Sequence, residues 1–153
     1  MDIPILSLLI IVPLIGAILT LLMGGERQKY AKYVAAVFAL ITLIITLFIM
    51  FGTEMGELSE TSSIVINFAL AIDGLSILMV FLTALLTLLV IVFSAEEKDR
   101  PNYFHTLVMA MEVGLMGVYL ASDYFLFYVM WEITLIPMYF MISWYGGPRR
   151  HYA

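Results

Sequence analysis

Cysteine is absent from this chain of 153 residues. Without thiols, the chain itself cannot form a disulfide framework, and it cannot bind an iron–sulfur cluster or a structural zinc through cysteine. The sequence also lacks a glycine-rich phosphate loop, a nucleophile–base set and a basic patch for nucleic acid. We therefore expect no redox active site, no cofactor or metal in this chain, and no nucleic-acid partner.

Charged residues are scarce, at 12% of the chain, whereas 63% of the residues are hydrophobic. The mean hydropathy is +1.06. Soluble domains carry about 25% charged residues, so this composition excludes an ordinary soluble domain. It predicts an integral membrane protein whose main surroundings are the lipid bilayer.

Five apolar stretches are long enough to cross a bilayer, which takes about 20 helical residues. The predicted fold is therefore an all-α integral membrane protein, with residues 1–153 forming a single membrane domain. A β-branched and partly alternating segment, SIVINFALAI, predicts a short extended or hairpin piece before the third span. The predicted spans cover residues 3–23, 30–51, 74–93, 104–121 and 124–145.

Basic residues fall on one side of this five-span arrangement. The positive-inside rule makes that side cytoplasmic. We therefore expect a multi-pass protein of the cell membrane, with the N-terminus outside and the end at residue 153 inside. The seven basic residues are Arg27, Lys29, Lys32, Lys98, Arg100, Arg149 and Arg150.

Two helix starts carry recognisable capping signals. Asp73 directly precedes the third span and is expected to cap it. Asp99 precedes Arg100 and Pro101, which predicts a cap on the fourth helix with proline in its first turn.

Two glutamates lie in the middle of predicted spans. Glu132 lies within the stretch 124–145, and Glu112 lies at the centre of 104–121. An ionisable side chain is costly inside a membrane, so it usually marks an ion or proton path. The alternative is that each acid only forms hydrogen bonds between helices. We favour proton translocation for both residues.

Helical spacing adds a third candidate on the fourth span. His105, Glu112 and Tyr119 recur every seven residues and so lie close to one face, with His105 near the cytoplasmic end. This face predicts a proton uptake line, although a histidine so close to the interface is more often structural.

Pro137 marks a predicted helix break beside Glu132. A proline at this position cannot donate a hydrogen bond to the carbonyl of Ile133. Helical spacing places Tyr124, Tyr128, Glu132 and Tyr139 on one broad face of this span. Free backbone groups are tolerated in membranes only where protein or water satisfies them, so we expect an interior position for this face. No lysine or arginine lies in the middle of a span, so a counter-cation for Glu132 must come from outside these residues.

Two segments, WEITLIPMYFMISWYGG (131–147) and AIDGLSILMVFLTALL (71–86), resemble the antiporter-like proton-pumping subunits of respiratory complex I. The chain is most similar to the N-terminal portion of the M-type, or chain 4, subunits, including relatives in the deazaflavin dehydrogenases of methanogens. The order of parts agrees: an extended segment, an acid in the fourth span, and a tryptophan–glutamate pair in the fifth.

This resemblance implies an antiporter-like fold of about fourteen helices built on inverted repeats. It implies that Glu132 works with a lysine of the seventh span and that Glu112 supports proton uptake. On this comparison, the chain is expected to be truncated before the proton-channel repeats are complete.

The expected function is that of a proton-translocating, non-redox membrane subunit of an NADH- or deazaflavin-dependent quinone or methanophenazine oxidoreductase. Its partners are then the other membrane subunits, which hold the redox cofactors, and the quinone or methanophenazine binds elsewhere in the complex. One alternative is a subunit of a multisubunit Na⁺/H⁺ antiporter or a membrane-bound hydrogenase. Another is a structural membrane scaffold in which the acids only fix helix packing.

Overall fold

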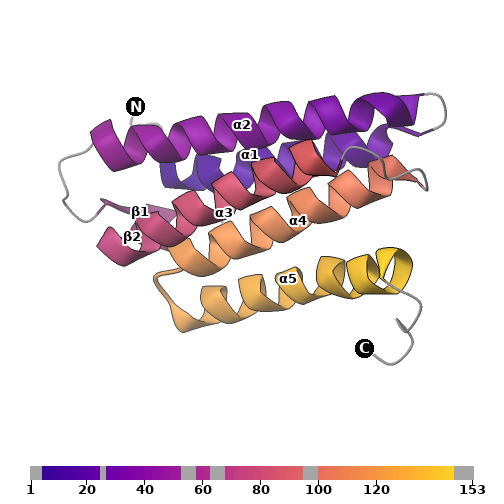
Figure 1. Cartoon of the computed structure of the whole chain (residues 1–153). Helices are drawn as coiled ribbons and strands as arrows, with labels where there is room; N and C mark the ends of the chain where they lie inside the picture. Colours follow the sequence, from indigo (N-terminus) through magenta and orange to yellow (C-terminus); the bar gives the residue numbers. More distant parts are fainter. Residues whose placement is uncertain (1–4, 25–26, 53–57, 63–67, 95–99, 147–153) are drawn as a thin grey trace.

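Five long helices make up most of the computed structural model, which describes residues 5–24, 27–52, 58–62, 68–94 and 100–146. Each helix is long and apolar enough to cross a membrane, which confirms the predicted five-span, all-α membrane fold. The helices lie side by side along one direction, with α5 at the edge of the bundle (Figure 1). Their bounds are α1 (Ile5–Leu22), α2 (Gln28–Gly52), α3 (Gly74–Phe93), α4 (Pro101–Leu120) and α5 (Tyr124–Tyr145).

A β-hairpin precedes α3, as the predicted extended segment suggested. Strand β1 (Leu58–Ser62) pairs antiparallel with β2 (Phe68–Ile72). The second strand also meets the α4–α5 junction, where the Ser122 N–H donates to the Ala69 carbonyl at 2.9 Å. The hairpin therefore fastens this end of the bundle.

The caps of α3 and α4 differ in how well the sequence anticipated them. The Oδ1 atom of Asp73 accepts hydrogen bonds from the N–H groups of Leu75, at 3.1 Å, and Ser76, at 2.6 Å. The Ser76 N–H, mainly, lowers the pKa of Asp73, which confirms the predicted cap. At α4, however, Arg100 and not Asp99 occupies the N-cap position, with a left-handed φ of 54° and no side-chain cap. Asp99 lies outside the described residues.

Helix α4 is the centre of the bundle and packs against all four other helices. Helix α5 packs chiefly on α4, through a face that includes Met130 and Thr134. Two glycines of α4 allow this approach: a Cβ added at Gly114 would lie 3.1 Å from the Thr134 Cα, and one added at Gly117 would overlap Met130. The α4–α5 pair is therefore held at close backbone distance.

Gly114→Ala is expected to destabilise the bundle by about 1–3 kcal/mol, because the new methyl group meets the Thr134 backbone and forces α5 outward. Gly52→Ala is the control, since a Cβ there meets only the Phe48 ring at 3.6 Å and alanine favours helix. The measurement is the midpoint of SDS-induced unfolding in mixed micelles. Equal midpoints for Gly114→Ala and the unaltered chain would contradict this packing.

Candidate functional site

Glu112 is buried at the centre of the helix bundle. Its side chain is 1% exposed, and neither carboxyl oxygen has a hydrogen-bond partner in the described part of the chain. Most buried polar groups in proteins are paired, so a fully buried carboxyl without a partner needs an explanation. A carboxyl held in this way can carry a proton in its neutral form, whereas its ionised form is costly in a membrane.

A groove of about 470 Å³ lies beside Glu112, between α3, α4 and α5. Thr83 and Thr87 of α3 contribute its polar groups on one side, and Tyr119 of α4 contributes another. The Thr83 hydroxyl already donates to the Met79 carbonyl at 2.9 Å. The other lining residues are apolar, so the groove places a few polar side chains near Glu112 in otherwise apolar surroundings.

Glu132 lies on the opposite side of α5 from α4. Met130 and Thr134 face α4, and two residues of helix correspond to a rotation of about 200°, so Glu132 points outward. Its side chain is exposed in the five-helix unit and lines a shallow groove of about 460 Å³ formed by α5 alone. The interior position expected for this face is therefore not present within these five helices.

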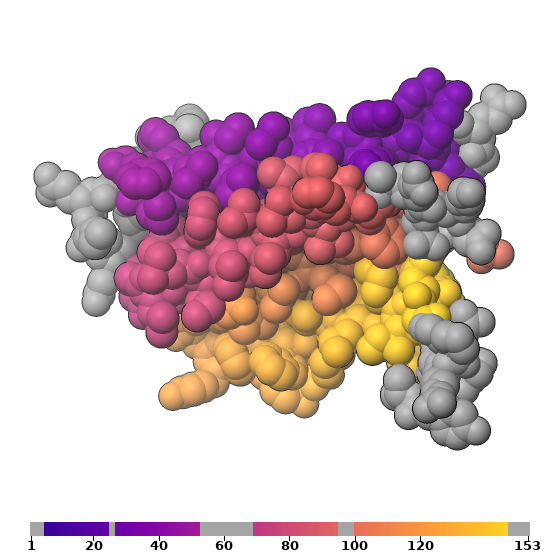
Figure 2. Space-filling view, in the orientation of Figure 1, coloured from indigo at the N-terminus to yellow at the C-terminus, as the bar shows by residue number. Residues whose placement is uncertain are grey.

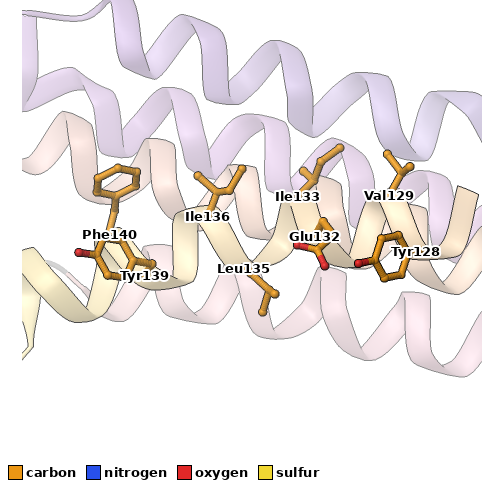
Figure 3. A pocket seen from close by; sticks show the side chains of 8 residues that line it. All are labelled: Tyr128, Val129, Glu132, Ile133, Leu135, Ile136, Tyr139 and Phe140. Atoms are coloured by element: carbon orange, nitrogen blue, oxygen red, sulfur yellow. The ribbon is translucent and has the colours of Figure 1, made fainter. Parts of the chain in front are cut away.

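Tyr128 shares this outer face with Glu132. Its hydroxyl points toward the Glu132 carboxyl and interacts with it (Figure 3). Tyr139 lies on the other side of the same groove, so the face combines an acid with two tyrosines. Such a set can hold and pass protons only where water or another protein element reaches it.

The two acids lie at the same depth but in different grooves. Glu112 is eight residues from the C-terminal end of α4, and Glu132 is eight residues from the start of α5, so both lie about 12 Å from the α4–α5 junction. The structure does not bring them into one cavity. Any transfer between them therefore has to pass around or through α5.

Pro137 is buried and lies inside a continuous α5. The predicted break is thus a missing N–H donor within an unbroken helix, not an end of the helix.

His105 is buried, at 2% exposed, on the same side of α4 as Glu112. Its Nδ1 lies 2.6 Å from the Pro101 carbonyl oxygen, and its Nε2 has no partner among the described residues. Asn102, which was not predicted as a site residue, is equally buried, and its Oδ1 also has no partner in the described part of the chain. The spacing of three residues from His105 was the available signal.

No group of three or more histidine, cysteine, aspartate or glutamate side chains in the described ranges is placed to hold a metal ion. The polar residues of the site are instead single acids, tyrosines and a histidine distributed along α4 and α5. Such separate side chains can each bind and release a proton, so this arrangement suits stepwise proton transfer.

Comparisons with known proteins agree with this architecture. The family described as "NADH-Ubiquinone oxidoreductase (complex I), chain 5 N-terminus" matches residues 58–100. The "F(420)H(2) dehydrogenase subunit M" of Methanosarcina mazei is 33% identical over 159 residues, covering 98% of this chain and 32% of that protein. The chain is a homologue of the antiporter-like membrane subunits of complex I. The "NAD(P)H-quinone oxidoreductase chain 4" of Synechococcus elongatus is 41% identical over 103 residues, covering 67% of this chain and 19% of that protein.

A solved structure shows the antiporter-like fold directly. A chain of respiratory complex I from Thermus thermophilus superposes with a TM-score of 0.80 at 24% identity, covering 95% of this chain and 30% of that one. This homologue of the antiporter-like subunits spans less than a third of the length of the curated relatives named above. The resemblance found in the sequence is therefore confirmed for the fold and the family.

Proposed function

We propose that this chain is part of a proton-translocating membrane subunit in a complex I-like NADH- or deazaflavin-dependent quinone or methanophenazine oxidoreductase. The observation that supports this most is Glu112, a fully buried carboxyl in the central membrane helix with no partner for either oxygen among the described residues. If Glu112 only stabilised helix packing, its carboxyl oxygens would form hydrogen bonds with a neighbouring helix. An acid that binds and releases protons has to form and break hydrogen bonds in turn, and the unpaired oxygens of Glu112 agree with this role.

Glu132 is the second proposed relay acid, and its exposure indicates where partners pack. Ionisable side chains in membrane spans almost always face a protein interior or a water-filled cavity, not lipid. Only 17% of the apolar window of α5 is buried in this unit, against 56% for α4. We therefore assign the face around Tyr128, Glu132 and Tyr139 to contact with further membrane helices, which supply the counter-cation. Helix α5, orange to yellow in Figure 2, lies at the lower edge of the molecule.

The redox chemistry belongs to other subunits in this proposal. This chain would bind no cofactor, while its partners bind the electron donor, the redox groups and the quinone or methanophenazine. The relatives support this division, because by name each is one subunit or chain of a dehydrogenase or quinone oxidoreductase. The chain would then contribute charge movement, driven by conformational or electrostatic changes in its neighbours.

The proposed orientation puts the α1–α2 turn on the cytoplasmic side and the α4–α5 junction outside, as the basic residues indicate.

Cysteine labelling tests this orientation cleanly, because the chain has no cysteine of its own. Lys29→Cys and Tyr124→Cys place single thiols at exposed positions near opposite ends of the bundle. An impermeant maleimide should label Tyr124→Cys in intact cells and Lys29→Cys only in inverted vesicles. Labelling of both from the same side would exclude the five-span orientation.

The substitution Glu112→Gln tests the proposed proton translocation at the residue on which the proposal mainly rests. The amide keeps the size of the carboxyl but cannot release a proton, so the protons moved per substrate oxidised should fall severalfold. The measurement uses inverted vesicles containing the assembled complex, with Thr46→Val as a control that alters an equally buried side chain of α2. Unchanged stoichiometry in Glu112→Gln, with normal assembly, would reject a relay role for this acid.

A further inference from the structure

A second polar site lies in the first turns of α4, away from both glutamates. Asn102 and His105 are three residues apart on one helical face, and each is 2% exposed. The Asn102 Oδ1 and the His105 Nε2 are both without a hydrogen-bond partner among the described residues. Two neighbouring buried side chains with unpaired atoms indicate a bound donor that both can share.

The hydrogen bond at Nδ1 determines what this donor has to be. The Pro101 carbonyl, 2.6 Å away, can only accept, so the His105 Nδ1 carries a hydrogen and donates it. In the neutral ring, Nε2 is then an acceptor, and the Asn102 Oδ1 is an acceptor as well. A single water molecule has two hydrogens, so it can donate one to each.

Neighbouring hydroxyl groups do not meet this need. Thr106 donates to the Asn102 backbone carbonyl at 2.8 Å, and Thr20 of α1 lies 2.9 Å from two carbonyls of its own helix. The two hydroxyls also lie 3.0 Å from each other. Each hydroxyl has one hydrogen, so acceptors outnumber donors around this site.

We propose that Asn102 and His105 hold a buried water molecule and form a proton-loading site at the basic, proposed cytoplasmic, end of α4. This assignment rests on the proposed function for its role, although the water site itself stands on the unpaired acceptors. A proton that arrives from outside is passed through the water to Nε2: the water takes up one proton and gives up another, and the ring becomes an imidazolium. The Nε2–H then donates to the water oxygen, the water donates to the Asn102 Oδ1, and the Nδ1–H still donates to the Pro101 carbonyl. The proton later leaves from the same Nε2 through the water.

The surroundings of the site favour transient loading. The Phe104 ring packs edge-on to His105 at 5.4 Å and to Tyr145 of α5 at 5.3 Å, which covers the imidazole with aromatic surface. Lys32 of α2 acts electrostatically on the ring. A positive charge on His105 therefore has a cationic neighbour that helps to expel the proton.

The loading site is separated from Glu112 by apolar side chains. His105 and Glu112 are seven residues apart, or about 10.5 Å along the helix axis. Val108 and Met109 are buried between them, at 8% and 0% exposed. A proton therefore has to wait on His105 until this barrier hydrates, which separates uptake from onward transfer.

Solid-state NMR tests the water site directly. The full chain carries only two histidines, so ¹⁵N-histidine labelling with His151→Gln leaves His105 as the single reporter. In lipid bilayers, we expect a neutral ring protonated at Nδ1, with magnetisation transfer from water to the ring. Absence of this transfer in the chain with native Asn102 would overturn the proposal and needs no further variant.

Asn102→Leu should reduce the water transfer to background, because the apolar side chain removes one of the two acceptors. Thr46→Val, which removes an equally buried hydroxyl whose bond stays within α2, should leave the transfer unchanged. Transfer that persists in a folded Asn102→Leu chain would remove Asn102 from the site. Helix content and detergent-resistant folding are measured alongside.

Proton pumping by the assembled complex tests the loading role separately. His105→Phe and Asn102→Leu should each lower the protons moved per substrate oxidised severalfold, whereas Thr46→Val should not. If both variants pump normally and Glu132→Gln is defective, the loading role is overturned and the proposed function stands. If Glu132→Gln pumps normally and water transfer to His105 is retained, the relay role of Glu132 is rejected and the water site stands.

Discussion

Replacing Glu132 by glutamine is expected to remove most proton translocation while leaving the complex assembled. The amide has nearly the same shape as the carboxyl and can still accept a hydrogen bond from Tyr128, but it cannot bind and release a proton. Positioned proton-transfer groups contribute about 10²–10⁴-fold to the rates they assist, so the protons moved per substrate should fall to about a tenth or less.

The measurement compares substrate oxidation with proton uptake in the same vesicles, because tight coupling would slow both. Asp123→Asn is the matched control: it removes an acidic charge just before α5 while keeping an oxygen that can cap the Phe125 N–H. We expect near-normal pumping from this control. Full pumping by Glu132→Gln would show that α5 carries no relay acid.

The length of the apolar stretches predicted the helices well, because each membrane span needs about 20 apolar residues in one continuous stretch. The observed α3 (Gly74–Phe93) and α5 (Tyr124–Tyr145) have the bounds predicted from the sequence. Helix α4 begins at Pro101, three residues before the predicted span at 104. Hydropathy finds the apolar part of a helix, whereas α4 extends into polar residues such as Asn102 that are buried by other helices.

The strand β1 was not predicted, because its sequence, LSETS, is polar and short. Its pairing with β2 depends on the antiparallel register, with Leu58 opposite Ile72. Pairing of this kind is a tertiary property, and a pattern within one strand does not contain it.

Residue spacing predicts which side chains share one side of a helix, but it does not predict which neighbouring helix that side contacts. Spacing correctly grouped Tyr128, Glu132 and Tyr139 on one side of α5. It did not reveal that this side points away from α4, because that depends on Gly114 and Gly117 admitting Met130 and Thr134 on the other side. Small residues that determine helix contacts become evident only when both helices are placed.

In the candidate site, too, some residues could be identified from sequence spacing, whereas others could be identified only from the structure. The seven-residue spacing of His105 and Glu112 placed them near one face, and both are buried. The importance of Asn102 follows only from the unpaired Oδ1 and from the absence of spare donors on Thr20 and Thr106. Accounting for each donor and acceptor requires coordinates.

The 153-residue chain alone, reconstituted in lipid vesicles, is expected to conduct no protons above background. Its two membrane acids line separate grooves, and Glu132 lies on an outer face. None of the seven basic residues lies in the middle of a span. Without a cation, an ionised carboxyl in the bilayer costs several kcal/mol, so proton flux through these separate grooves should stay at background.

The assay imposes a potassium diffusion potential and follows internal pH with a trapped dye, with a protonophore added at the end to show that the vesicles are sealed. Infrared spectra of the same samples should show a protonated carboxyl band that weakens in Glu112→Gln. A robust proton flux from the chain alone would show that five helices suffice. It would also overturn our assignment of the α5 face to further helices, because the counter-cation they supply would then be unnecessary.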